Sequence, residues 1–435
     1  MRAIILDGSK VNDTTGERVL NALLKVLQAN DCEADHIIIR DQKIGNCAGN
    51  FSCWIHSPGM CRVDDDNRRI AEAVMASDLM VYLTPVTFGG YSSILKRMVD
   101  HQIQNILPYF TKIDGETHHK NRYEKNPDFL VVGWMDTPDT HSETVFKYLA
   151  KRNAINLYNK RTVCGVVHAN HSDDEIFVSM QNWLTDLNNG HMLKQVRLPE
   201  GGDKHSSNEM KQALLLIGSP RTRKSTSNSL GEYLFERLAA KSIQTKTVYL
   251  HTVVRSAEKM NALFETINAA DLVTLAFPLY VDSLPSPVID ALEQIAANRQ
   301  SQGETHRPLF MAITNCGFPE AVHNTTALAM CEIFARQANF NWAGSLALGG
   351  GEMVHGKPLP DVGGQTMRIR KSLESVAEAL TQGQAIPKAA QELMAKPVIP
   401  HWLYRFLGEL GLKRAAKSYG VGKLIKRQPY LVKKQ

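Results

Sequence analysis

Hydroxyl, basic and glycine residues gather in one short stretch of the chain, residues 218–227, which reads Gly-Ser-Pro-Arg-Thr-Arg-Lys-Ser-Thr-Ser. An apolar run precedes this stretch and leucines at helical spacing follow it, which predicts a loop between a strand and a helix N-terminus. Backbone N–H groups and the positive end of the helix dipole would there point at one place, where an arginine can hold an anion. The pattern therefore predicts a phosphate site made by Ser219, Arg221, Ser225, Thr226 and Ser227. The ordinary alternative is that these hydroxyls only cap the helix.

Two later apolar runs, residues 272–277 and 309–314, end in residues that would lie beside this loop, because parallel strands present their carboxyl ends at one edge of a sheet. The residues predicted to line the site there are Pro278, Leu279, Tyr280, Val281, Asn315, Cys316 and Gly317. A phosphate loop beside a flat apolar surface suits FMN. It suits a dinucleotide poorly, because neither half of the chain carries Gly-x-Gly-x-x-Gly after its first strand.

The first half of the chain repeats this order of features. An apolar run at residues 4–6 leads into a polar stretch at residues 8–16, and a second run at residues 80–83 ends in Thr-Pro-Val. Two strand, loop and helix units of this kind indicate two tandem domains of one type. The corresponding predicted site residues are Ser9, Thr14, Thr15, Pro85, Val86, Thr87 and Gly89.

The elements that must position these loops alternate between strand and helix, and their fully apolar strands are typical of a parallel sheet covered on both faces. The strands expected are residues 2–6, 36–39, 79–83, 129–133 and 162–167, then 213–217, 246–250, 272–277, 309–314 and 344–348. The helices expected in the first half are residues 15–29, 65–75, 92–106, 142–153 and 173–187. The fold predicted is α/β, with two tandem flavodoxin-like doubly wound domains that each have a five-stranded parallel sheet. The domains expected are 1–195 and 212–385, joined by a linker at 196–211 and followed by a basic extension at 386–435.

Composition narrows the class of protein. The 435 residues are 43% hydrophobic and 22% charged, and no apolar run has the length of a membrane span. The first strand begins at once, which leaves no room for a signal peptide and favours a cytoplasmic protein. Seven cysteines, an odd number, favour thiols over a disulfide framework.

The formal net charge of +6 lies in the C-terminal extension, where residues 401–435 hold nine Lys and Arg and one Glu. Aromatic and apolar residues alternate with these charges, as in segments that bind anionic lipid or an acidic partner. Glycines interrupt the pattern, so docking on the chain's own domains is favoured over contact with a membrane surface. No nucleic-acid-binding motif is present.

The loops together resemble those of the NADPH-dependent FMN reductase family of flavodoxin-like oxidoreductases. The second half carries the resemblance in residues 218–227 and 278–280, and the first half in residues 53–65 and 85–100. The resemblance implies bound FMN that is reduced by NADH or NADPH and passes electrons to a flavin, a quinone, an azo or nitro compound, or a partner protein. The first half departs from the family pattern, because its phosphate loop carries Asp13 and no arginine, and His101 follows Asp100 where arginine is common.

The first half is also similar to iron–sulfur flavoproteins, whose cluster has four cysteine ligands. Cys47, Cys53 and Cys61 stand in the corresponding segment, but Asn50 occupies the place of the second cysteine of a compact motif. A cluster needs four thiolates, so we expect none. Zinc held by these cysteines and His56 is the alternative, but reduced thiols without a metal are favoured because the spacing is irregular.

The function predicted is an FMN-dependent NAD(P)H oxidoreductase, in which no side-chain acid or base is required because the flavin carries the chemistry. The alternatives are a flavodoxin-like electron carrier and a redox or scaffold protein in which one domain lacks FMN. The partners expected are a small-molecule acceptor or a redox protein. We also expect the two domains to form a pseudo-dimer or the chain to form a homo-oligomer. The polar insertion that holds His118, His119, Arg122 and Tyr123 is predicted to be a surface loop without a catalytic role.

Overall fold

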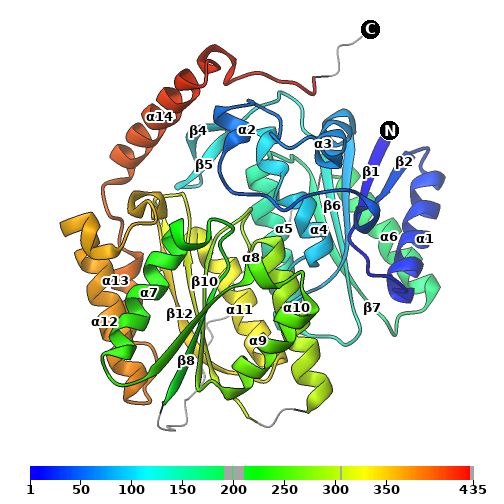
Figure 1. Ribbon diagram of the computed structural model, residues 1–435. Helices are drawn as coiled ribbons and strands as arrows, with labels where there is room; N and C mark the ends of the chain where they lie inside the picture. Colours follow the sequence, from blue (N-terminus) through cyan, green and yellow to red (C-terminus); the bar gives the residue numbers. More distant parts are fainter. Residues whose placement is uncertain (191–197, 199–209, 304–305, 432–435) are drawn as a thin grey trace. The chain divides into compact units, whose positions relative to one another are not determined.

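The computed structural model describes residues 1–190, 198, 210–303 and 306–431, and the chain divides into two compact units. Unit 1 comprises Met1–Leu198 and Leu407–Gln435, and unit 2 comprises Pro199–Phe406 (Figure 1). Of the predicted linker at 196–211, residues 196–197 and 199–209 lie outside the described residues. Within the described part of the chain, no helix combines the length and apolar character needed to cross a membrane.

Unit 1 is built on a parallel five-stranded sheet in the order β2-β1-β3-β6-β7. Its strands are β1 Arg2–Asp7, β2 Glu33–Ile38, β3 Leu79–Pro85, β6 Asp128–Met135 and β7 Thr162–His168. The central strand β3 is buried from Leu79 to Thr84, as expected for a strand with helices on both faces. The order is the flavodoxin-like one, so the predicted fold class is confirmed for this unit.

Helices cover both faces of this sheet. They are α1 Thr14–Ala29, α3 Asp66–Ala76, α4 Ser93–Val99, α5 Thr140–Leu157 and α6 Asp173–Asn188, with the short α2 Ser52–Ile55 and the 3-10 turns η1 Ile39–Asp41 and η2 Gln102–Asn105. Helices α1 and α6 lie side by side and pack on one face through one apolar cluster (Figure 1). On the other face, Tyr82 of β3 contacts Tyr91, which in turn contacts Phe146 of α5.

The helix predicted over residues 92–106 is too long. The helix α4 ends at Val99, residues Gln102–Asn105 form the 3-10 turn η2, and β4 begins at Ile106. The Trp54 indole donates hydrogen bonds to the carbonyls of Ile103 at 2.9 Å and Ile106 at 3.1 Å and so satisfies two carbonyls of this turn.

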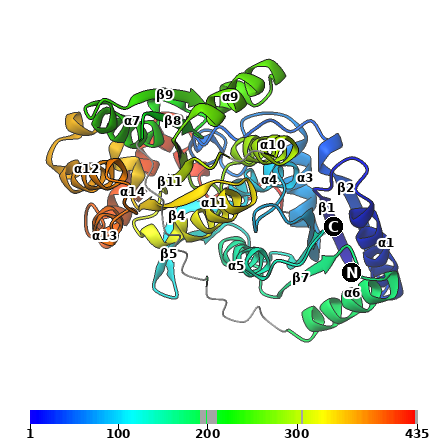
Figure 2. The ribbon, with the colours of Figure 1, turned by 90° about the horizontal axis from the view of Figure 1, so that it is seen from below.

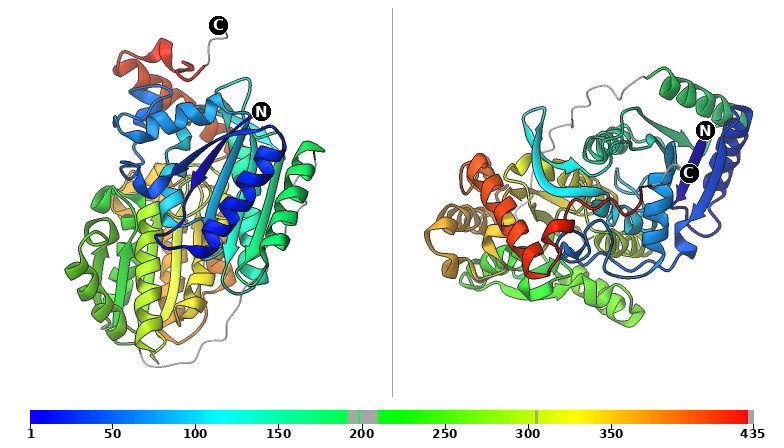
Figure 3. Two further views of the ribbon diagram at one scale, coloured as in Figure 1. Left: turned by 90° about the vertical axis from the view of Figure 1, so that its right-hand side faces the viewer. Right: turned by 90° about the horizontal axis from the view of Figure 1, so that it is seen from above.

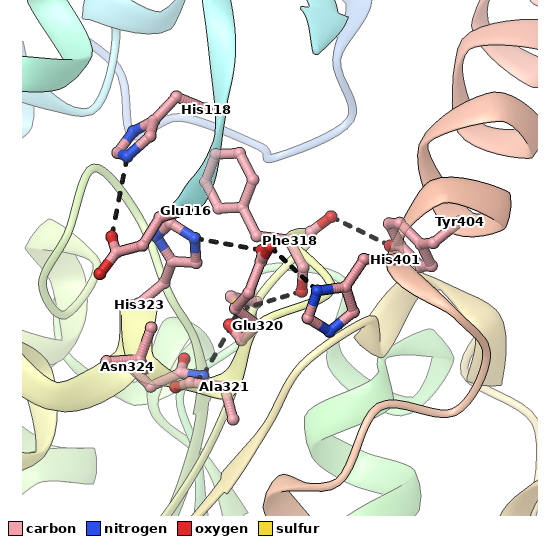
Figure 4. Close-up of polar contacts among 12 residues, drawn as sticks. Glu116, His118, Phe318, Glu320, Ala321, His323, Asn324, His401 and Tyr404 are labelled. Atoms are coloured by element: carbon pink, nitrogen blue, oxygen red, sulfur yellow. Dashed lines mark hydrogen bonds and ion pairs between the residues drawn. The ribbon is translucent and has the colours of Figure 1, made fainter. Parts of the chain in front are cut away.

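The polar insertion is a β-hairpin, so the predicted surface loop is wrong. Strands β4 Ile106–Ile113 and β5 Glu116–Asn121 pair antiparallel around Asp114 and Gly115, which both have positive φ. Asp-Gly is a strong hairpin signal because it accepts that turn geometry. His118 of β5 is buried, with its Nδ1 2.7 Å from Asn156 Oδ1 and its Nε2 3.7 Å from Glu116 Oε2 (Figure 4).

The end of the chain packs on this hairpin within unit 1 (Figure 3). Ala416 and Ile425 join an apolar cluster with residues of β4, and η7 Gly422–Leu424 forms one turn in this segment. The buried Arg122 guanidinium donates to the carbonyls of Ile425 at 3.1 Å and Arg427. The described C-terminal segment of unit 1 therefore docks on its own chain, which is the arrangement that the sequence favoured.

Unit 2 repeats the same topology, with the order β12-β11-β10-β8-β9. Its strands are β8 Gln212–Ile217, β9 Gln244–Tyr249, β10 Leu272–Pro278, β11 Leu309–Asn315 and β12 Asn341–Leu348. All four neighbouring pairs are parallel. The second flavodoxin-like domain is thereby confirmed.

The helices of unit 2 also lie on both faces of the sheet. They are α7 Thr226–Ala239, α8 Leu250–Val253, α9 Ala257–Ala269, α10 Ser286–Gln302, α11 Thr325–Gln337, α12 Met367–Thr381, α13 Lys388–Ala395 and the start of α14 His401–Ser418, with the 3-10 turns η3 Thr222–Lys224, η4 Ala321–Asn324, η5 Gly351–Val354 and η6 Leu359–Thr366. Helix α12 lies between α7 and α13 on one face (Figure 2). On the other face, Phe310 of β11 contacts Phe334 of α11. The segment predicted to begin a separate extension at residue 386 thus supplies α13 to this unit.

Candidate functional site

Three of the predicted loops of unit 2 meet at the carboxyl edge of its sheet. The register pairs Pro278 with Asn315, and Asn315 with Leu348, so β10, β11 and β12 end at one level. The Gly218 amide donates to the Ala276 carbonyl at 2.8 Å, which brings the loop after β8 to the same edge. The Leu279 amide donates to the Asn315 carbonyl, also at 2.8 Å, and joins the two loops that follow β10 and β11.

The hydroxyl-rich loop after β8 enters α7 as the sequence predicts. Ser225 is the N-cap, with its Oγ accepting a hydrogen bond from the Asn228 amide at 3.2 Å. Ser227 Oγ accepts from Asn315 Nδ2 at 2.9 Å, which ties the helix start to the end of β11. The amides of Thr226 and Ser227 donate to no residue that the structure describes, as is normal for a first helical turn. The loop therefore presents backbone donors and buried hydroxyls together, with Ser219 Oγ accepting from the Arg221 amide.

Arg221 has a partner that the sequence did not suggest. Its guanidinium Nη2 lies 3.0 Å from Glu352 Oε1, and both side chains are about two-fifths exposed. The pair lies in the half-exposed range, where an ion pair contributes little stability. An incoming phosphate would therefore compete with a weakly held carboxylate for Arg221.

The turn after β10 has positive φ angles at both of its central positions, and the turn after β3 in unit 1 has the same backbone geometry. Tyr280 and Ser283 exchange backbone hydrogen bonds of 2.9 and 3.1 Å, and between them Val281 has φ 43° and Asp282 has φ 60°. A β-branched residue rarely adopts positive φ, and such strain is concentrated at ligand sites. In unit 1, residues 87–90 form the same turn, with φ 52° and 76° at its two central positions.

Two parts of this edge were missed by sequence reasoning. The first is the glycine triplet at residues 349–351, where a Cβ on Gly351 would lie 2.7 Å from Asn315 Oδ1. Three glycines directly after a predicted strand are a signal that could have revealed this close approach. Thr226 Oγ1 donates to the Gly351 carbonyl at 2.8 Å, so the triplet contacts the predicted phosphate loop.

The second missed part is the start of α14, which lies on the loop after β11 (Figure 4). Tyr404 Oη donates to the Gly317 carbonyl at 3.0 Å, and His401 Nδ1 lies 3.3 Å from Glu320 Oε1. Burial raises the pKa of Tyr404, so the phenol keeps its proton and remains a donor. No local pattern marks this contact, because more than eighty residues separate its two partners.

In unit 1 the loops after β1 and β3 also meet, where the Gly8 amide donates to the Leu83 carbonyl at 2.7 Å. Polar groups of the predicted phosphate loop there already bind other residues. The Ser9 amide donates to Asp7 Oδ1 at 2.8 Å, and Ser9 Oγ accepts from Arg40 at 2.7 Å. Burial acts to raise the pKa of Asp7, but hydrogen bonds with His36 and Ser9 outweigh it and hold that pKa below its usual value. Thr14 and Thr15 begin α1. The remaining predicted residues of this unit, at the end of β3 and in the turn that follows, are Pro85, Val86, Thr87 and Gly89.

Comparison with known proteins finds a family model that matches part of unit 1. Residues 1–121 match the model of the family described as NADPH-dependent FMN reductase. Residues 1–121 are therefore similar to the NADPH-dependent FMN reductase family, over less than half of the chain.

Two iron-sulfur flavoproteins are similar to this chain. That of Methanosarcina thermophila is 26% identical over 103 residues, which cover 24% of this chain and 53% of the relative. That of Archaeoglobus fulgidus is 28% identical over 109 residues, which cover 25% and 47%. The chain thus spans about half the length of these curated relatives. A solved FMN-dependent NADH-azoreductase from Bacillus anthracis, in complex with FMN, is 13% identical and aligns with 40% of this chain and 100% of its own, at a TM-score of 0.30.

Unit 1 also carries the three cysteines singled out by the sequence. Burial raises the pKa of Cys47 to about 12 and raises that of Cys53 further. Burial also acts to raise the pKa of Cys61, but a hydrogen bond with His101 outweighs it and the net pKa is lowered. Among the described residues, no group of three or more His, Cys, Asp and Glu side chains is arranged to hold a metal ion.

We expect the purified protein to contain no iron–sulfur cluster. The exposed Asn50 accepts a hydrogen bond from the Ser52 amide at 3.1 Å and supplies no thiolate where a fourth ligand would be needed. Iron and acid-labile sulfide should both be near zero in protein prepared without oxygen. Four irons per chain would contradict this expectation, and Asn50→Cys, which restores the thiolate, is the matched variant.

Proposed function

We propose that the protein is an FMN-dependent NAD(P)H oxidoreductase whose FMN binds at the carboxyl edge of the unit 2 sheet. The observation that carries the proposal is the meeting of three features at that edge. They are the donor-rich start of α7, the strained turn at residues 280–283 and the loop after β11. The family match of residues 1–121 supports the same chemistry for the fold that unit 2 repeats.

The residues at this edge fit FMN. The phosphate would be held by backbone amides of residues 225–227, which are at most 4% exposed, with Arg221 supplying positive charge. Leu279, Tyr280 and the rigid turn after them offer the ring an apolar surface and backbone amides. Bound FMN would supply hydride acceptance from a nicotinamide and electron delivery to an acceptor. The protein's part is to bind and orient it, so no side-chain acid or base is needed.

The finer assignments belong to the same proposal. The acceptor class is a flavin, quinone, azo or nitro compound, or a redox protein, and the two units act as an intramolecular pseudo-dimer or the chain as a homo-oligomer. Seven free cysteines suit the reducing cytoplasm. The second candidate is an electron carrier of the flavodoxin type, which the shared strand order favours.

The two candidates differ in whether nicotinamide reduces the flavin directly. We expect the protein to be yellow when loaded with FMN, and we expect NADH or NADPH to bleach its visible absorbance without oxygen and without an added reductase. Oxygen or a quinone should then restore the colour. Loss of colour only after a separate reductase is added would favour the carrier and remove the oxidoreductase assignment.

A further inference from the structure

Strand register identifies which residue of unit 1 corresponds to Asn315 of unit 2. Pro278 pairs with Asn315, whose carbonyl accepts from the Leu279 amide at 2.8 Å. In unit 1, Pro85 pairs with Trp134, whose carbonyl accepts from the Val86 amide at 2.9 Å. Because the strand order and these contacts agree, Trp134 occupies in unit 1 the position that Asn315 occupies in unit 2.

Trp134 in place of Asn315 changes which side chain lies against the helix after the first strand, which is α1 in unit 1 and α7 in unit 2. Asn315 has a small side chain, and its Nδ2 donates a hydrogen bond to Ser227 Oγ. Trp134 is 3% exposed, and its ring lies flush against α1, since a Cβ on Gly16 would be only 2.7 Å from Trp134 Cζ2. The indole therefore fills space beside the helix start that unit 2 leaves to smaller groups.

The N-cap residues differ in charge as well. Ser225 caps α7 with a neutral hydroxyl, whereas Asp13 caps α1 with a carboxylate. Asp13 Oδ1 accepts from the Gly16 amide at 2.8 Å, and its Oδ2 accepts from Trp134 Nε1 at 3.0 Å. A carboxylate held at a helix N-terminus satisfies the same backbone donors and the same dipole that would bind a phosphate.

We propose that the Asp13–Trp134 pair closes the phosphate position of unit 1, so that the chain binds FMN through unit 2 alone. This inference rests on the proposed function. It sets Ser9, Thr14 and Thr15 aside as phosphate ligands, because a phosphate dianion would meet the Asp13 carboxylate at close range and repulsion between like charges is strong in a partly buried site. The family match and the working flavin site then fall in different units.

The test introduces into unit 2 the N-cap carboxylate that unit 1 carries. In the full-length protein, Ser225→Asp places a carboxylate at the N-cap of α7, and Ser225→Asn is the neutral control, since both residues are good N-caps. Asp13→Asn is the unit 1 variant, which keeps the cap and removes the charge. For each protein the FMN bound per chain and its Kd are measured by equilibrium dialysis. Riboflavin, which lacks the phosphate, is titrated in parallel, and thermal unfolding reports whether the variants fold.

We expect one FMN per chain in the parent. Ser225→Asp should weaken FMN at least about tenfold, since one added charge near a phosphate has an effect of this order. It should leave riboflavin binding unchanged, and Ser225→Asn should lose far less FMN affinity. Asp13→Asn should keep at least one FMN.

Two FMN per parent chain would overturn the inference and leave the proposed function intact. One FMN that survives Ser225→Asp at full affinity or is lost in Asp13→Asn would overturn the inference and also the placement of FMN in unit 2, while leaving the proposed reaction intact. A parent protein that binds no FMN at all would instead remove the proposed function, and this inference with it.

Discussion

Replacing Arg221 by alanine is expected to weaken FMN binding roughly ten- to a hundredfold. The change removes a charge-assisted hydrogen bond to the phosphate, which contributes about 1.5–3 kcal/mol. Glu352→Gln should act in the opposite direction, because Glu352 now holds the Arg221 guanidinium at 3.0 Å and competes with the ligand for it. Quenching of FMN fluorescence on titration with protein measures both effects.

Arg223 supplies the matched control for Arg221. It lies in the same loop, but its guanidinium carbon sits 6.0 Å from the Tyr249 ring centroid. Arg223→Ala should therefore change the FMN Kd much less than Arg221→Ala does. If Arg221→Ala binds FMN as tightly as the parent, the phosphate lies elsewhere, and the placement of FMN in unit 2 loses its main support.

The largest expected effect on stability follows from replacing Lys96 by methionine. Lys96 and Asp100 form an ion pair one turn apart at the end of α4, and the two side chains are 0% and 1% exposed. The substitution would leave a buried carboxylate without its cation, which should lower the free energy of unfolding of unit 1 by about 3–5 kcal/mol. Urea unfolding followed by tryptophan fluorescence measures the loss, since three of the five tryptophans lie in unit 1.

Two controls separate this effect from simple loss of a lysine. Lys147→Met breaks another pair of the same spacing, with Glu143, whose side chains are 37% and 22% exposed, and should cost less than about 1 kcal/mol. The double variant Lys96→Met with Asp100→Leu removes both charges and should be more stable than Lys96→Met alone. A double variant that is no more stable than the single one would show that charge pairing is not the cause.

The sheets and their carboxyl-edge loops were predictable because local patterns determine them. Uninterrupted apolar runs marked the inner strands of both sheets, and the hydroxyl-rich residues 218–227 marked the start of α7. The polar edge strands β2 and β9 begin earlier than predicted, at Glu33 and Gln244. In a parallel sheet these patterns also determine which loops meet, so residues far apart in sequence were brought to one edge correctly.

The remaining features depend on contacts between distant residues, which a single sequence does not encode locally. Glu352 on Arg221 and Tyr404 on Gly317 join segments 131 and 87 residues apart. The helix predicted through residue 106 ends at Val99, and an indole from another segment bonds the turn that follows it. The hairpin is different, since Asp114-Gly115 was a local signal that sequence reasoning overlooked.

The cysteine segment contains the thiol that we expect to react first with alkylating reagents. Thiol alkylation proceeds through the thiolate, so the sulfur with the lowest pKa reacts first when access permits. Cys61 is half-buried and has a lowered pKa, whereas burial raises the pKa of Cys32, Cys164, Cys316 and Cys331 as well as those of its two neighbours. A protein with seven thiols thus offers one preferred point for attaching a fluorophore or a spin label without mutagenesis.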